Sequence, residues 1–223
     1  MPQFDKTPYP SRYNSLRLLG YDYTSIRKLC AITLVAYGRR PVFADMLLAK
    51  AILTSLLSPA TLAKLHLRAF TLMPDHLHLL AGISSPSLGI PNVVGAFKSF
   101  TTQLYWKRSQ EIIASREISL PSQNVNRSDS RESRSLMPAL LDGLVTLRPE
   151  VVELKHWPSI RPESFVKKHL WQAKFFDHVI RNDKDLQENL DYIAMNPVRA
   201  GYVSHSCFYP YTGFLDSLAE SAH

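Results

Sequence analysis

The segment LHLRAFTLMPDHLHLLAGI, residues 65–83, decides the fold of this chain. Two short β-patterned runs flank the tripeptide Met73-Pro74-Asp75. Proline and aspartate favour tight turns, so we predict that the two runs pair as an antiparallel hairpin. The second run also carries two histidines, His76 and His78, inside an otherwise apolar strand. Buried imidazoles without partners cost free energy, so a hydrogen bond, a metal or a substrate must engage them.

Two further elements are expected before the hairpin. Residues 30–43, CAITLVAYGRRPVF, are rich in β-branched and apolar side chains and predict a strand that ends at Pro41. Residues 45–58 have apolar side chains at helical spacing. Asp45 is a plausible N-cap and Pro59 follows the last turn, so this segment predicts a helix.

After the hairpin, residues 90–112 predict an amphipathic helix. The side chains expected to face the core are Val94, Phe97 and Leu104, and those expected to face water are Lys98, Lys107 and Arg108. Residues 170–180, LWQAKFFDHVI, predict a strand or an extended turn. The final helix is expected to begin at Asn182 or Asp183 and to close at Pro197, because a residue that precedes proline is pushed out of α space.

This order of elements predicts an α+β fold, an antiparallel sheet with helices packed on a face. We expect a polar leader at residues 1–17 and one domain formed by residues 18–118 and 163–205. Between its two parts, residues 119–162 are rich in Ser, Asn, Arg and Pro and predict a flexible insertion. Residues 206–223 are expected to be an irregular tail.

The composition of the chain limits the classes of function that are expected for it. The chain has 223 residues and a formal net charge of +7, which favours a polyanionic partner such as nucleic acid. No apolar run is long enough to span a membrane, and residues 1–15 are too polar for a secretory signal. The two cysteines, Cys30 and Cys207, lie far apart without metal-ligand spacing. A cytoplasmic protein, with no membrane partner, is therefore expected.

The histidine pair has a definite geometry on a strand. Residues two apart point to the same face, so His76 and His78 share one side, and the leucines between and after them share the other. The turn places His76 at the start of its strand, near the edge of the sheet. Two imidazoles can reach one divalent ion and leave positions open for substrate. The alternative is that both are ordinary half-buried histidines bonded to neighbouring groups.

Two chemistries use such a pair. Nucleotide hydrolysis by histidine-triad enzymes needs a third histidine where this chain has Leu80. Metal-dependent DNA nicking needs a tyrosine on a separate element as the nucleophile. Tyr192 and Asn196 lie four residues apart and so on one face of the final helix. Asn196 could supply a metal-ligating oxygen and Tyr192 a phenol, although either could equally be an ordinary helix residue.

Several motifs together resemble one family, the single-tyrosine HUH transposases, and especially the REP-associated tyrosine transposases. The motifs occur in the family's order between residues 18 and 203: GYDY, MPDHLHLL, AFKSFTT, LWQAKFFDHVIRNDKDL and YIAMNPVRAGYV. The resemblance implies a ferredoxin- or RRM-like sheet, the HUH endonuclease fold, with the histidines on a central strand. It implies that His76, His78 and Asn196 bind Mg²⁺ or Mn²⁺ and that Tyr192 is the nucleophile.

The same resemblance implies cleavage of single-stranded or hairpin DNA through a 5′-phosphotyrosine intermediate, by a monomer or a homodimer. Candidate phosphate contacts are Lys98, Lys107, Arg108, Lys167, Lys168, Lys174 and Arg199. Trp106, Trp171 and Phe175 are candidates for base stacking, although packing is the more natural role for the last two. The alternatives are a domesticated hairpin-binding protein without catalysis and a metal-dependent nucleotide hydrolase.

Overall fold

The computed structural model describes residues 28–85, 88–118, 154–165 and 168–215. These residues form an α+β fold with one five-stranded antiparallel sheet in the order β4-β1-β3-β2-β5. The strands are β1 Cys30–Val35, β2 Leu65–Met73, β3 His76–Ile83, β4 Phe176–Val179 and β5 Thr212–Phe214. The helices are α1 Met46–Leu56, α2 Pro59–Leu62, α3 Ile90–Ile118 and α4 Asp183–Arg199.

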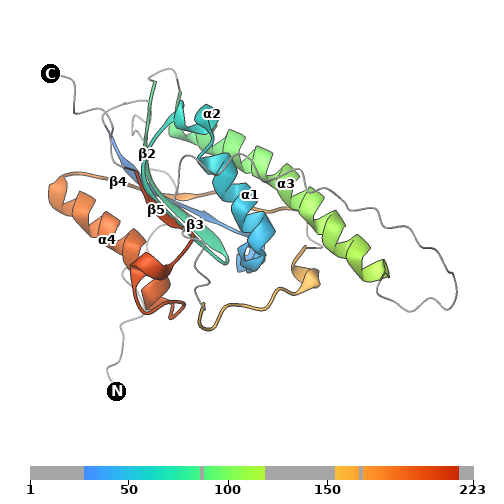
Figure 1. Ribbon diagram of the computed structural model, residues 1–223. Coiled ribbons are helices and arrows are strands. Elements are labelled where there is room, and N and C mark those ends of the chain that lie inside the picture. Colours follow the sequence, from blue (N-terminus) through green and yellow to red (C-terminus); the bar gives the residue numbers. More distant parts are fainter. Residues whose placement is uncertain (1–27, 86–87, 119–153, 166–167, 216–223) are drawn as a thin grey trace, which may run out of the picture.

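The predicted ferredoxin-like fold is confirmed. The elements β1-α1-β2-β3-α3-β4 follow the ferredoxin-like β-α-β-β-α-β order, and their four strands form the sheet order β4-β1-β3-β2. Strand β5 and helix α4 follow this unit in the chain. Strand β5 extends the sheet beside β2, and helix α4 lies on the face opposite α1 and α3 (Figure 1). The part of α3 farthest from the sheet projects beyond it (Figure 1).

The predicted hairpin is the centre of the sheet. Strands β2 and β3 pair from Leu65↔Ile83 to Met73↔His76, which leaves Pro74 and Asp75 as the turn. Because β3 lies between β1 and β2, His76 starts a central strand, as the family resemblance implied. The separate expectation that His76 lies near the edge of the sheet is wrong.

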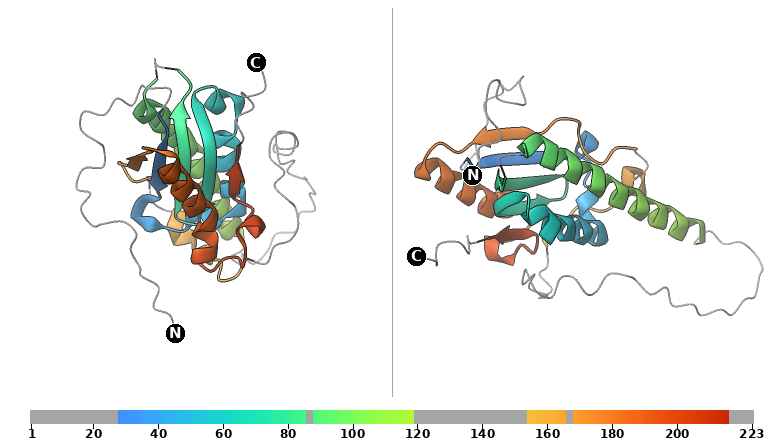
Figure 2. Two further views of the ribbon diagram at one scale, coloured as in Figure 1. Left: turned by 90° about the vertical axis from the view of Figure 1, so that its left-hand side faces the viewer. Right: turned by 90° about the horizontal axis from the view of Figure 1, so that it is seen from above.

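The two faces of β3 have different environments. Leu77, Leu79 and Ala81 belong to the main hydrophobic core on the side of α1 and α3. On the other face, Leu80 packs in a smaller cluster with Ala69 of β2 and Ile193 of α4. Figure 2 (left) shows α4 in front of the sheet with the other helices behind it. The histidines therefore lie on the face that α4 partly covers.

Two predicted boundaries are wrong. Strand β1 ends at Val35, not at Pro41, because the backbone takes positive φ angles of 67° at Gly38 and 50° at Arg39. Helix α4 continues through Pro197 to Arg199. A proline so close to a helix end removes one late hydrogen bond, and the backbone bonds of Ala200 to Asn196 and of Tyr202 to Pro197 close the last turn. The predicted caps are confirmed, because the side chains of Asp45 and Asn182 each accept a backbone hydrogen bond.

Segments on both sides of α4 join the core. The chain after Gly201, predicted to be irregular, supplies strand β5 and the buried rings of Tyr209 and Tyr211. Trp157, inside the predicted insertion, packs against both rings, and its indole N–H donates to the carbonyl oxygen of Ala44. Leu154 and Trp157 thus pack against the core, whereas residues 119–153 of the predicted insertion lie outside the described residues. None of the helices that the structure describes is long and apolar enough to cross a membrane.

Candidate functional site

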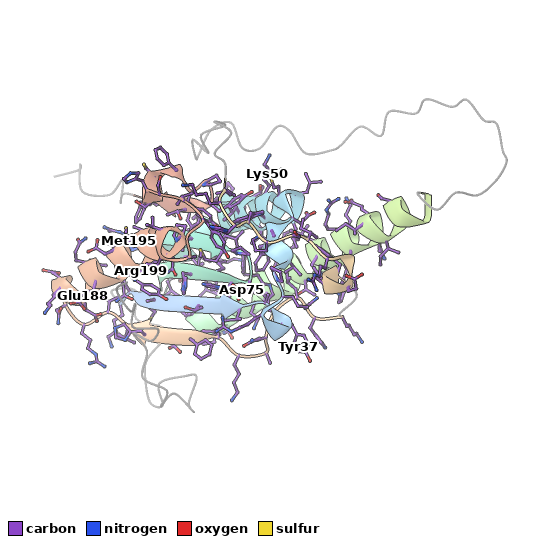
Figure 3. All side chains as sticks on the ribbon, turned by 90° about the horizontal axis from the view of Figure 1, so that it is seen from below. Tyr37, Lys50, Asp75, Glu188, Met195 and Arg199 are labelled. Atoms are coloured by element: carbon purple, nitrogen blue, oxygen red, sulfur yellow. The ribbon has the colours of Figure 1, made fainter. Side chains whose placement is uncertain are left out.

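The two histidines are the first and third residues of β3, next to the turn that joins β2 to β3. The ring centroids of His76 and His78 are 4.6 Å apart and their planes are nearly perpendicular, at 83°. On β1, the cross-strand neighbours are Val35 for His76 and Thr33 for His78. Figure 3 shows Asp75 at this end of the sheet, near Tyr37, whereas Glu188 of α4 lies toward the other end. The strand period thus brings both rings to one face, as the sequence predicted.

Each imidazole is held through its Nδ1 atom. The Nδ1 of His78 lies 2.8 Å from the hydroxyl oxygen of Thr33. The Nδ1 of His76 lies 2.5 Å from Oδ1 of Asp75, and the other carboxylate oxygen, Oδ2, accepts a bond from Arg39 at 3.4 Å. The carboxylate of Asp75 can only accept, so the Nδ1 of His76 is the donor in that bond. The Thr33 hydroxyl can donate or accept, and the tautomer with a proton on Nδ1 of His78 leaves the lone pair of its Nε2 available to a metal. The turn residue and the neighbouring strand therefore fix both ring orientations.

Burial sets the charge of His78. Burial, together with the positive charges of His76 and Arg39, lowers the pKa of His78 well below its ordinary value of 6.5, against an opposing effect of Asp75. The ring is therefore neutral at neutral pH, the form that coordinates metal ions. Its Nε2 atom is buried and has no hydrogen-bond partner among the described residues. A buried nitrogen left in this state is costly unless a ligand engages it.

Helix α4 brings Tyr192 to the histidines. The Tyr192 ring lies edge-on to the His78 ring, with centroids 5.3 Å apart and planes at 82°. Ile193, the next residue, is buried against Leu80 and anchors this part of the helix to the sheet. At the start of α4, Asp185 accepts hydrogen bonds at 2.9 Å from Nε2 of His178 on β4.

Two other predicted residues lie around Tyr192. Asn196 is half-buried, and its amide nitrogen donates to the backbone oxygen of Tyr192 at 3.1 Å. The guanidinium of Arg199, two turns after the tyrosine, lies 5.5 Å from the centroid of the Tyr192 ring. Figure 3 shows that Arg199 and Met195 of α4 lie closer to Asp75 than Glu188, on the same helix, does. One face of α4 thus presents a phenol, an amide and a positive charge.

The donor set suits a divalent cation with open positions. Among the described residues, no group of three His, Cys, Asp or Glu side chains could hold a metal ion. The two imidazoles, one with an orphaned Nε2, fit a partial site that an amide oxygen and water or phosphate would complete. The carboxylate of Asp75 is a typical outer partner of a metal-binding histidine, and the Thr33 hydroxyl engages the same atom of His78.

The predicted phosphate contacts divide into two groups. Lys98 and Arg108 are engaged within the protein: Lys98 donates to the carbonyl oxygens of Gln172 and Ala173, and Arg108 forms two bonds to Asp45 at 2.8 and 2.9 Å. The expectation that both face water freely is wrong. The second group of predicted phosphate contacts is exposed and consists of Lys107, Lys168, Lys174 and Arg199. The remaining candidate, Lys167, lies outside the described residues.

The aromatic candidates also divide. Trp171 and Phe175 are buried in the main core, so packing is their role. Trp106 is 44% exposed and its indole N–H donates to the carbonyl oxygen of Lys168. Sequence reasoning missed Thr33 and Asp75 as partners of the histidines. Asp75 had a signal, its position next to His76, whereas Thr33 is found only from the register of β1 against β3.

Part of this chain is similar in sequence to a known family of proteins. Residues 28–118 match the model of the family described as Transposase IS200 like, which confirms the resemblance predicted from the sequence. The matched residues include both histidines but not Tyr192.

Two curated relatives match shorter stretches. A putative REP-associated tyrosine transposase of Haemophilus influenzae is 44% identical over 52 residues, 23% of this chain and 30% of that protein. The REP-associated tyrosine transposase of Escherichia coli K12 is 38% identical over 56 residues, 25% of this chain and 34% of that protein. The chain thus spans about a third of the length of these relatives. A solved structure of the REP-associated tyrosine transposase bound to a REP hairpin has a TM-score of 0.46 and 17% identity, covering 83% of this chain and 75% of that one.

Proposed function

We propose that this protein is a metal-dependent tyrosine transposase that nicks and rejoins single-stranded DNA near a hairpin. The observation that carries the proposal is the edge-on contact between the Tyr192 ring and the ring of His78, a buried imidazole whose Nε2 has no hydrogen-bond partner among the described residues. The family match over residues 28–118 and the names of the two curated relatives support the same reading. A hydrolase of small nucleotides has no use for a tyrosine in this position.

Three side chains are proposed to hold the cation, which we expect to be Mg²⁺ or Mn²⁺. These are His76 and His78 through Nε2, and Asn196 through its amide oxygen. When bound, the cation would polarise the scissile phosphate and offset the charge that develops on it. Thr33 and Asp75 keep the two rings oriented, and burial keeps His78 uncharged.

Tyr192 then supplies the nucleophile. Its phenolic oxygen attacks the phosphorus, a tyrosine–phosphorus ester forms, and the bond to the 3′-oxygen of the preceding nucleotide breaks. The phenolic proton leaves to solvent, and the departing oxygen takes up a proton to become a free 3′-hydroxyl. The 5′-phosphotyrosine retains the energy of the broken ester, so a 3′-hydroxyl can later reverse the step without an external energy source. Arg199 beside the Tyr192 ring supplies positive charge where the phosphate would lie.

The decisive experiment is a covalent-adduct assay. Protein is incubated with labelled single-stranded hairpin DNA and Mn²⁺, and denaturing electrophoresis is used to detect a resistant complex. We expect an adduct with the wild-type chain, none with Tyr192→Phe, and none when EDTA is added. Tyr37→Phe, which removes the hydroxyl of an exposed tyrosine, is the matched control and should form the adduct normally.

The other outcomes separate the alternatives. An adduct that persists in Tyr192→Phe would exclude this tyrosine as the nucleophile. Salt-sensitive hairpin binding without any adduct would indicate a binding protein that has lost catalysis. Turnover of small nucleotides without an adduct would indicate the hydrolase. The number of chains in the active complex, one or two, can be measured on the same DNA complex by light scattering.

A further inference from the structure

An exposed phenylalanine lies in the same row of the sheet as His78. Phe176 on β4 is the cross-strand partner of Thr33 on β1, and Thr33 is in turn the partner of His78 on β3. Directly opposed residues of antiparallel strands point to the same face of a sheet. Phe176 therefore lies on the face that carries the histidines and Tyr192, two strands away from His78.

The environment of Phe176 is not that of a core residue. Its side chain is 41% exposed, whereas the preceding Phe175 points to the opposite face and is only 4% exposed. Helix α4 packs across β2 and β3, and β4 lies at the uncovered side of this face (Figure 2, left). A large apolar ring is thus presented to solvent on the same face as the candidate metal site, two strands away from it, at the end of the sheet where the imidazoles lie.

The charges around this ring indicate what kind of molecule could cover it. Lys174 is exposed just before β4, and Arg39 and Arg199 are exposed around the histidines. The neighbouring carboxylate, Asp75, is already engaged by His76 and Arg39. An exposed aromatic ring with Lys174 two residues before it, and with Arg39 and Arg199 near the histidines, suits a strand of nucleic acid, which offers flat bases for stacking and phosphates for the cations. An apolar protein partner would leave these cations without counter-charges.

We propose that Phe176 stacks against a base of the single-stranded DNA next to the scissile phosphate. This inference rests on the proposed function, because the scissile phosphate is placed by the histidines and Tyr192. Two strand spacings put Phe176 about 10 Å from His78, within reach of the nucleotides that neighbour a phosphate bound there. Phe176 would hold the strand in register over the cations while the phosphate faces the tyrosine.

The test separates stacking on bases from attraction to phosphates. Two probes of the same length, about 12 nucleotides, are compared in EDTA by fluorescence anisotropy: oligothymidylate and its abasic counterpart, which has the same phosphates without bases. The wild-type chain should bind oligothymidylate more tightly. Phe176→Ala should weaken oligothymidylate binding between about 5- and 100-fold and leave abasic binding unchanged. The dependence of binding on salt should not change, since it reports phosphate contacts.

Three further variants make the result specific. Phe176→Tyr keeps the ring and should bind oligothymidylate normally, whereas Phe176→Leu keeps apolar bulk without a ring and should resemble Phe176→Ala. Phe100→Ala removes a phenylalanine of similar exposure, 51%, from α3 on the other side of the sheet and should have no effect. Equal thermal midpoints for all variants would show that folding is intact, as expected for a side chain on an edge strand.

A second measurement locates the base. The hairpin substrate is synthesised with 5-iodouracil at successive positions, irradiated, digested and examined by mass spectrometry for cross-linked peptides. Cross-linking of the Phe176 peptide only from positions next to the cleavage site supports the proposal. Two results would overturn the proposal about Phe176 even if the wild-type chain forms the covalent adduct. One is unchanged oligothymidylate binding by Phe176→Ala, and the other is cross-linking to other peptides only. Absence of both adduct and DNA binding in the wild-type chain would instead refute the proposed function.

Discussion

The Tyr192 ring lies edge-on to the His78 ring, with their centroids 5.3 Å apart, although the two residues belong to different halves of the chain. The contact depends on α4, which Ile193 anchors to the sheet through Leu80 and which His178 holds at its first turn. The nucleophile and its candidate metal site are therefore assembled by packing between a helix and a strand.

Removal of the Thr33 hydroxyl should weaken metal binding without unfolding the protein. Thr33→Val leaves the Nδ1 atom of His78 without its partner at 2.8 Å, so the ring loses the bond that presents Nε2. Loss of such an outer partner typically lowers metal affinity about 10- to 100-fold. Titration of Mn²⁺, followed by electron paramagnetic resonance, measures this directly. Thr102→Val, which removes a hydroxyl bonded only within α3, should bind Mn²⁺ like the wild type.

Substitution of Arg108 should lower the stability of the protein, whereas substitution of its neighbour Lys107 should affect only DNA binding. Arg108 donates two bonds to the buried carboxylate of Asp45, so Arg108→Ala should lower the free energy of unfolding by about 1.5–3 kcal/mol. Lys107 is exposed, and Lys107→Ala should leave stability unchanged. Urea denaturation measures the first effect. If Lys107 contacts a phosphate, the salt dependence of DNA binding should fall by about one charge in its variant only.

Gly213 should be intolerant of any side chain. A Cβ atom at this position would lie 2.5 Å from two ring atoms of Phe70, its cross-strand partner, which is fully buried. Gly213→Ala should therefore lower the free energy of unfolding by about 1–3 kcal/mol through overpacking. Gly95→Ala is the matched control, because the space around Gly95 on α3 is open, and it should be neutral or slightly stabilising. Equal unfolding midpoints for the two variants would contradict the close packing of β5.

Acid should weaken the link between β4 and α4. Burial alone would raise the pKa of Asp185, but hydrogen bonds from His178 and from the Arg181 N–H, with their charges, lower it below the ordinary value of 3.8. A carboxylate with a lowered folded-state pKa contributes stability above its unfolded pKa, and that contribution is lost as the pH falls through the folded value. Unfolding of the wild type and of Asp185→Asn, compared between about pH 5 and pH 2, should therefore converge toward low pH. A constant difference across this range would contradict the link.

The hairpin and the histidine pair could be predicted from the sequence because both are local. The two-residue strand period fixes the face of His76 and His78, and Pro74-Asp75 fixes the turn. The spacing of Tyr192 and Asn196 is equally local. The partners that complete the site are not, since Thr33 reaches His78 only through the register of β1 against β3. That register is set by the whole core.

Other differences between the predicted and the observed structure also arise because contacts between distant parts of the chain cannot be read from local sequence. The three-residue strand β5 is too short to show an alternating pattern, so it could not be predicted from sequence. Arg108 resembles a solvent-facing cation on its own helix, and only the packing of α1 against α3 brings Asp45 to it. Phe175 and Phe176 are indistinguishable in the sequence, and the pairing of β4 with β1 decides which of them faces solvent.

The sheet order also bears on how this chain is synthesised. The three inner strands, β1, β3 and β2, come from residues 30–83, whereas both outer strands, β4 and β5, come from residues after 175. A nascent chain that has left the ribosome only through α3 therefore exposes two unpaired strand edges, which are templates for association with other chains. Helix α4, encoded between the two outer strands, arrives in the same late portion. Release of an incomplete product would thus yield an aggregation-prone fragment that has the histidines but no Tyr192.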